Sequence, residues 1–262
     1  MSAIDTTIDT AGRRVPPLGG FSLTVLRIEL RRMLRNRNTL AFALLLPAAL
    51  FLSFGSTEGW EESVGNGNVA AYIMVSMALY GAALTAASGG TTVAMERSLG
   101  WSRQLRLTPL HPGVHVATKV LLALVLGAVA IVVVNLVGVV QGKPAMPLRI
   151  WLACALLSLL CTLVFAALGV LVGFLVPGEN AMQILGPGLA VLSFLGNVFI
   201  PIEEGTTVYA VAQWTPMFGV AEISRYPLTD DLAWTAVLNA AVWLVLFVGG
   251  AAWRMSRDTA RV

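Results

Sequence analysis

The chain has 262 residues, of which 57% are hydrophobic and only 12% are charged, and its formal net charge is +3. With a mean hydropathy of +0.79, it has too few polar side chains to cover a globule of that length, which excludes a soluble globular protein. We therefore expect an integral membrane protein. A helix that crosses a hydrocarbon core about 30 Å thick needs roughly 20 apolar residues.

The N-terminal 38 residues contain no long apolar run and no small-residue cleavage site, so they do not form a secretory signal peptide. We expect residues 1–20 to be a disordered cytoplasmic tail. In residues 21–38, leucines recur at helical spacing between arginines, which predicts an amphipathic helix in the membrane interface, with its cations among anionic headgroups. These cations are Arg27, Arg31, Arg32 and Arg35. Alternatively, they are simply the positive flank of the first span.

The rest of the chain contains six apolar runs of the length that a membrane helix needs. Runs such as LLALVLGAVAIVVV are apolar on all sides, whereas the strands of a membrane barrel alternate apolar and polar residues, so helices are predicted. The six predicted spans are 39–55, 69–94, 116–140, 150–176, 181–200 and 234–253. The first carries Pro47, and the fifth contains Gly186-Pro187-Gly188, which we expect to bend or break it.

The positions of the cationic residues indicate how the spans are oriented. With the N-terminus in the cytoplasm, fourteen of the 17 lysines and arginines fall on the cytoplasmic side, and only Lys143, Arg149 and Arg225 fall outside. The predicted outer loops are acidic instead. We therefore expect an all-α integral membrane protein with six transmembrane helices and both termini in the cytoplasm.

The chain lacks the residues that would power transport by itself. No G-x-x-x-x-G-K-[ST] sequence is present, so the chain cannot hold a nucleotide in a P-loop. The six spans contain no Asp or Glu for a proton or sodium relay. The polar residues at depth in the spans are neutral: Ser76, Ser88, Asn135, Thr162, Gln183, Asn197 and Asn239. Active transport would then be driven by a separate ATPase that binds ATP and Mg²⁺, while this chain binds no cofactor.

Two alternatives to an ATP-driven transporter fit the sequence less well. A proton-coupled secondary carrier needs an ionisable residue in its pathway. An intramembrane enzyme needs acids and histidines together at membrane depth, but Glu61-Glu62 and Glu203-Glu204 lie in predicted outer loops, and both histidines lie on the opposite side. His111 and His115 are separated by Pro112-Gly113 and have no third ligand nearby, so no metal site is predicted.

A basic island, residues 94–112, separates the second and third spans. It contains the string E-R-x-x-G-x-x-x-x-L-x-x-T-P, formed by Glu96, Arg97, Gly100, Leu105, Thr108 and Pro109. This string resembles the signature of permease subunits of the ABC type-2 exporter family, which includes the daunorubicin-type drug-resistance permeases. The resemblance covers residues 21–255. It implies an elbow helix at 21–38, a six-helix ABC type-2 transmembrane domain at 39–255 and a cytoplasmic tail at 256–262.

In that family the matching segment is the coupling helix, which sits in a groove of the ATP-binding subunit. Here Gly100 can end the second span, while Thr108 and Pro109 can begin the next segment as N-cap and first helical residue. Trp101 and Leu105 form a short apolar ridge at i, i+4. The ridge is flanked by Arg97, Arg103 and Arg106. The alternative is an ordinary basic loop with glycine and proline turns.

A second matching segment follows the fifth span. Family members have a Phe-Pro type break there, then an aromatic segment and a proline turn ending near an arginine, which form re-entrant helices at the outer gate. The residues at these places are Phe199, Pro201, Trp214, Pro216 and Arg225. This chain departs from the pattern at Gly205-Thr206-Thr207, which replaces the usual Leu-Pro pair.

The resemblance implies a permease subunit of an ATP-driven exporter in a bacterial plasma membrane, with no enzymatic activity of its own. Its partners would be ATP-binding subunits, a second permease copy or a paralogue, and membrane lipids, but no nucleic acid. Because the spans offer neutral amides, hydroxyls, aromatics and glycines, the substrate is expected to be hydrophobic or amphipathic. A drug, an antibiotic or a lipid-like product fits that description.

Overall fold

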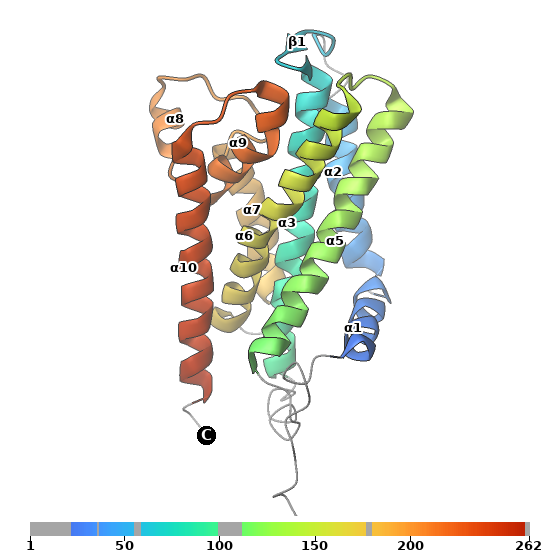
Figure 1. Ribbon diagram of the computed structural model, residues 1–262. Coiled ribbons are helices and arrows are strands. Elements are labelled where there is room, and N and C mark those ends of the chain that lie inside the picture. The colour runs from blue at the N-terminus through green and yellow to red at the C-terminus, as the bar shows by residue number, and fades with distance from the viewer. Residues whose placement is uncertain (1–21, 36, 55–58, 99–111, 177–179, 260–262) are drawn as a thin grey trace, which may run out of the picture.

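The computed structural model describes residues 22–35, 37–54, 59–98, 112–176 and 180–259 as a bundle of helices (Figure 1). The helices are α1 (Leu23–Arg35), α2 (Arg37–Phe54), α3 (Val69–Ser98), α5 (Pro112–Gln141), α6 (Leu148–Leu175), α7 (Asn180–Leu195), α8 (Thr207–Ala212), α9 (Pro216–Thr229) and α10 (Trp234–Thr259). Strands β1 (Ser63–Val64) and β2 (Gly67–Asn68) pair antiparallel as a small hairpin.

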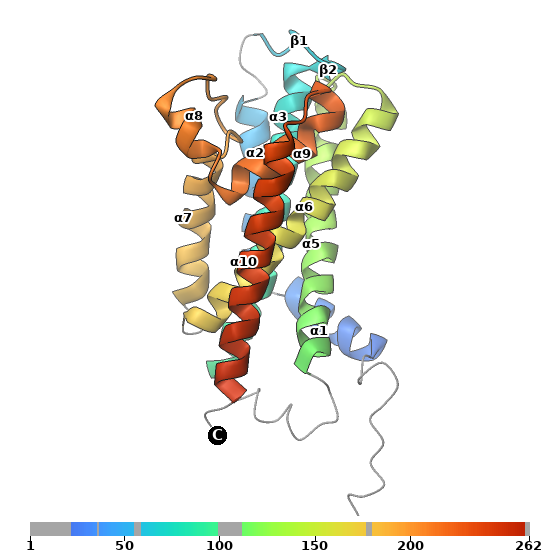
Figure 2. The same cartoon turned by 60° about the vertical axis from the view of Figure 1, so that its left-hand side comes forward.

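The bundle has two ends, which we name after the elements found there. The hairpin end carries β1, β2, α8 and α9, and the α1 end carries α1 together with the end of α10 (Figures 1 and 2). Four helices, α3, α5, α6 and α10, are long and apolar enough to cross a membrane, while α2 and α7 contain shorter apolar stretches. The chain is therefore an all-α, multi-pass membrane protein.

Each predicted apolar run lies in a helix, but the bounds of the helices differ from those of the runs. Helix α3 continues past residue 94 to Ser98, and α10 continues past residue 253 to Thr259, where a tail was predicted from residue 256. A helix satisfies its own backbone hydrogen bonds, so it need not end where its apolar surface ends. The predicted tail at 1–20 lies outside the described residues.

Of the predicted bend or break at Gly186-Pro187-Gly188, the break is wrong, because α7 runs without interruption from Asn180 to Leu195. A Cβ added at either of these glycines would meet nothing within 4 Å, so no close neighbour forces the backbone to turn there. The helix ends instead at Gly196, where an added Cβ would lie 2.4 Å from the Cβ of Met217 in α9. Asn197 follows with a φ of +60°, in the left-handed region.

Helix α3 is the central element of the bundle. Most of its apolar span is buried within the chain (83%), against 17% for α10, which lies at the periphery. Its main neighbour is α6, and the two backbones approach closely where both helices carry glycine. A Cβ at Gly169 would lie 2.2 Å from the carbonyl oxygen of Ala87, and one at Gly90 would lie 2.4 Å from the backbone nitrogen of Val170.

We expect Gly169→Ala to lower the free energy of unfolding by at least about 1–3 kcal/mol, because the new methyl group would push α6 away from α3. The matched control is Gly249→Ala in α10, where an added Cβ meets nothing within 4 Å. Unfolding of both purified variants in mixed detergent micelles measures the difference. Equal stability of the two variants would show that the helices can separate at this point without cost.

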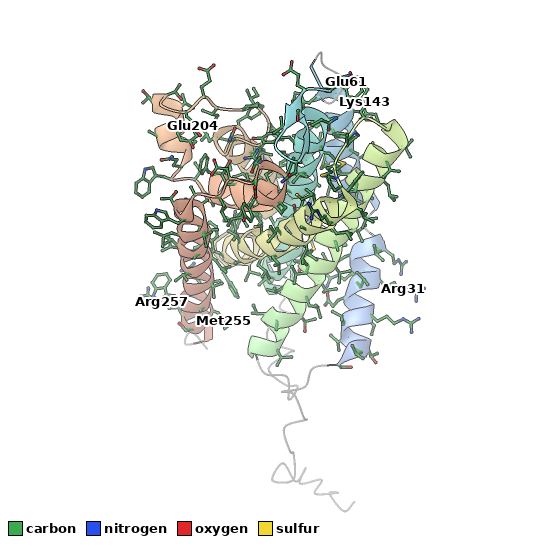
Figure 3. All side chains as sticks on the ribbon, turned by 45° about the horizontal axis from the view of Figure 1, so that its top comes forward. Arg31, Glu61, Lys143, Glu204, Met255 and Arg257 are labelled. Carbon is green, nitrogen blue, oxygen red and sulfur yellow. The ribbon has the colours of Figure 1, made fainter. Side chains whose placement is uncertain are left out.

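At the hairpin end, the buried side-chain amide of Asn68 joins several segments of the chain. Asn68 donates from Nδ2 to the carbonyl of Lys143 (2.9 Å), and its Oδ1 accepts from the backbone nitrogens of Ala145 (2.9 Å) and Ala71 (3.0 Å). The backbone nitrogen of Asn66 donates to the carbonyl of Leu228 (2.7 Å). The hairpin therefore joins the start of α3 to the α5–α6 loop and to the end of α9. Figure 3 shows Lys143 and Glu61 at this end, and Arg31 and Arg257 toward the other.

Candidate functional site

Four charged side chains from three helices meet at the α1 end, and we call them the α1-end cluster: Glu29 and Arg32 of α1, Glu96 of α3 and Lys119 of α5. Lys119 Nζ donates to Glu96 Oε1 (2.5 Å) and to Glu29 Oε2 (3.0 Å). Arg32 donates to the same oxygen of Glu96 at 3.5 Å. Among the residues that the structure describes, the cluster brings together two cations and two carboxylates.

The cluster is buried, so the cost of removing its charges from water is large. The side chain of Lys119 is 1% exposed and that of Glu96 is 4% exposed, whereas Glu29 is 15% exposed. Taking single charges out of water costs several kcal/mol each, and only close pairing offsets that cost. Neither Lys119 nor Glu96 can therefore leave this arrangement cheaply, and α1, α3 and α5 are held together at this point.

The helices position these side chains by simple periodicity. On α1, Leu26, Glu29, Leu30 and Met33 form the partly buried stripe that faces the bundle. Figures 1 and 2 both place α1 beside the first turns of α5. Glu29 thus occupies an apolar position of an amphipathic helix, where Lys119 is its partner.

The predicted coupling segment is only partly described. Glu96 belongs to the α1-end cluster, while the side chain of Arg97 and residues 99–111 lie outside the described residues. The segment's other predicted residues, Gly100, Trp101, Arg103, Leu105, Arg106, Thr108 and Pro109, fall within that stretch. The α1-end cluster thus joins the two helices that flank it, since α3 ends at Ser98 and α5 begins at Pro112.

Sequence reasoning missed Glu29 and Lys119 as site residues. It also gave no sign that Glu96, Lys119 and Arg225 are buried within the protein. Two signals were present in the sequence: an acid on the leucine stripe of α1 and a lysine inside an apolar run. Neither signal identifies a partner, because Glu29 and Lys119 are 90 positions apart.

At the hairpin end, Arg225 of α9 forms the centre of a second cluster. It was predicted to be a charge of an outer loop, but its side chain is only 1% exposed. One terminal nitrogen donates to Glu222 Oε1 (2.7 Å) and the other to the carbonyl of Asn197 (2.7 Å) and to Ser76 Oγ (3.3 Å). Its guanidinium lies 4.5 Å from the centre of the Tyr72 ring. We call these five residues the Arg225 cluster.

The other predicted outer-gate residues lie nearby but do not form one site. Phe199 packs against Tyr80 and Phe194, with ring centres 4.8 Å away in each case. Pro216 is the first residue of α9, after the N-cap Thr215. Pro201 and Trp214 are exposed. The structure therefore places Phe199 in the segment after α7, joins Arg225 to that segment through the Asn197 carbonyl, and leaves Pro201 and Trp214 at the surface.

Comparison with known proteins agrees with this architecture. The family model of the ABC-2 type transporter matches residues 22–228. In Bacillus subtilis (strain 168), the protein described as "Putative transport permease YvfS" is 26% identical to this chain over 232 residues, covering 84% of this chain and 91% of that protein. Residues 22–228, which the family model matches, include both the α1-end cluster and the Arg225 cluster. The chain belongs to the ABC-2 type transporter family.

Proposed function

We propose that this chain is the permease subunit of an ATP-driven exporter, and that a separate ATP-binding subunit docks at its α1 end. The observation that carries the proposal is the α1-end cluster. For a movement of the ATP-binding subunit to reach the membrane helices, the segment between α3 and α5 must be attached rigidly to those helices. Glu96 and Lys119 fasten those two helices to each other and to α1 where the segment begins and ends.

The distribution of charge supports a cytoplasmic α1 end. The arginines of α1 lie at this end with Lys119 and with Arg257 of α10, whereas Glu61 and Glu204 lie at the hairpin end (Figures 1 and 3). Cationic residues are retained on the cytoplasmic side of membrane proteins. In this orientation, the end of α3 and the start of α5 face the cytoplasm, where ATP and Mg²⁺ on the partner are available.

We propose that α2, α3, α5, α6, α7 and α10 form the six spans, with α8 and α9 as re-entrant helices at the outer gate. A second copy of the chain or a paralogue would complete the pathway. Much of the helix surface is apolar, and many of the buried polar groups are hydroxyls bonded to carbonyls of their own helix, such as Thr85 and Thr162. A hydrophobic or amphipathic substrate, such as a drug, an antibiotic or a lipid, suits such surroundings.

The test is transport by the complex reconstituted with its ATP-binding subunit in vesicles. Leu105→Asp should abolish ATP-dependent efflux of a lipophilic dye, because an acid on the apolar ridge would oppose docking. Glu96→Gln should reduce efflux at least tenfold while ATP hydrolysis continues, because the attachment of the segment to Lys119 is weakened. Glu61→Gln, an exposed acid at the hairpin end, is the control and should transport normally. Full efflux by Leu105→Asp would contradict the coupling role.

A proton-coupled carrier is the second candidate, because Glu96 is a buried acid beside a lysine. The two functions differ in their source of energy. Vesicles that are depleted of ATP but carry a proton gradient should show no transport if the chain is an ABC permease. Transport under that condition, and its loss in Glu96→Gln, would favour the carrier instead.

A further inference from the structure

The outward face of α1 carries a stripe of cations that the bundle does not use. Arg27, Arg31 and Arg35 follow one another at i, i+4 and i+8, so they project from the same side of the helix, and all three are exposed. On the two sides of this stripe, Leu23 (73%) and Ile28 (62%) are exposed as well. We call this surface the α1 arginine face.

The chemistry of this face identifies its ligand class. The single acid of α1 is Glu29, which turns inward to Lys119, so all the charges on the exposed side of the helix are positive. A ligand that covers it must be anionic, and it must also cover the exposed leucine and isoleucine. The inner surface of a membrane that contains anionic phospholipids meets both needs at once, because their headgroups are negatively charged and the acyl boundary beneath them is apolar.

The opposite side of the same helix is part of the α1-end cluster. Glu29 and Arg32 are fastened to Lys119 and Glu96, at the base of the two helices that flank the coupling segment. If the membrane holds one side of α1 and these ion pairs hold the other, α1 cannot move without moving the helices to which it is paired. Whatever orders α1 against the membrane therefore also orders the first turns of α5 and the last turns of α3.

We propose that the α1 arginine face binds anionic phospholipid headgroups, and that the α1-end cluster makes ATP-coupled transport depend on this binding. The second part rests on the proposed function, whereas the first part does not. Each arginine near an anionic surface contributes about a fivefold factor in affinity. Three arginines therefore give a strong preference for anionic over zwitterionic lipid.

The first experiment measures binding without any transport. The full chain is purified with equal amounts of phosphatidylglycerol and phosphatidylcholine, and native mass spectrometry counts the lipids that it retains. The wild type should favour phosphatidylglycerol, and Arg27→Gln/Arg31→Gln/Arg35→Gln should lose that preference at least about tenfold. The corresponding triple lysine variant should keep it, as should the control Arg149→Gln/Arg257→Gln, which removes exposed charges elsewhere. Equal retention by wild type and the triple glutamine variant, or loss in the lysine variant, would overturn the proposal.

The second experiment tests the link to transport. The complex with its ATP-binding subunit is reconstituted in phosphatidylcholine vesicles with and without phosphatidylglycerol, an anionic lipid of the class that attracts polybasic segments. The anionic lipid should raise wild-type transport severalfold and leave the triple glutamine variant unchanged. Glu29→Gln should still retain phosphatidylglycerol but lose the stimulation.

The possible failures can be told apart. No ATP-dependent transport in either lipid would contradict the proposed function, while lipid retention would still decide whether the arginine face binds headgroups. Equal transport in both lipids would leave the proposed function standing and overturn the link. If the triple glutamine variant retained phosphatidylglycerol like the wild type but failed to assemble with the ATP-binding subunit, the face would belong to a protein interface and the proposal would be wrong.

Discussion

Lys119→Met is expected to lower the free energy of unfolding by about 3–5 kcal/mol, the cost of breaking a buried ion pair by removing one partner. Lys119 is the shared cation of Glu96 and Glu29, whose carboxylates lie 2.5 Å and 3.0 Å from its ammonium nitrogen. Without it, Glu96 remains almost fully buried, with the more distant Arg32 still 3.5 Å away. Unfolding of the purified variant in mixed detergent micelles measures the loss.

Two further variants separate the ion pair from the packing of the side chain. The double variant Glu96→Gln/Lys119→Met should lose less stability than the sum of the two single changes, because it removes both buried charges together. Arg149→Met, in the first turn of α6, is the control. Arg149 is exposed, so its removal should cost no more than about 0.5 kcal/mol. Additive single effects would mean that Glu96 and Lys119 do not interact in the native protein.

Arg225→Met should have the second largest effect, a loss of about 3 kcal/mol or more, because it leaves Glu222 without its cation and the Asn197 carbonyl without its donor. Arg225 also reaches Ser76 on the central helix α3. The side chain therefore holds α9 to α3 and to the turn after α7. We expect the variant to unfold at a lower concentration of the denaturing detergent in mixed micelles. We also expect α9 to become sensitive to proteolysis.

The lysine variant shows whether the shape of the guanidinium matters. Arg225→Lys keeps the charge but cannot present donors to Glu222, Asn197 and Ser76 from one planar group, so it should recover only part of the lost stability. The control is Arg257→Met in α10, an exposed arginine that lies 4.0 Å from the Trp253 ring centre and should cost less than about 1 kcal/mol. Wild-type stability of Arg225→Met would refute a structural role for the Arg225 cluster.

The Arg225 cluster explains why part of the predicted outer gate could be found from the sequence and part could not. Arg225 was recognisable from its motif, but the motif says nothing about burial. Asn197 was predicted only as a neutral residue in a span. In the structure its carbonyl oxygen accepts a hydrogen bond from Arg225, and its Oδ1 accepts one from the backbone nitrogen of Ile202. Its left-handed backbone directly follows Gly196, which approaches Met217 closely, and that approach joins distant parts of the chain.

The sequence by itself determined the membrane class, the helical character and the position of each long apolar run, because these depend on local composition and on hydrogen bonds within one helix. It also indicated the family through residues close together in the chain. Only the tertiary structure decided that Glu29, Arg32, Glu96 and Lys119 meet, and that Arg225 is buried rather than exposed. Ion pairs across 23 to 90 positions depend on how helices pack against one another, and no local pattern encodes that packing.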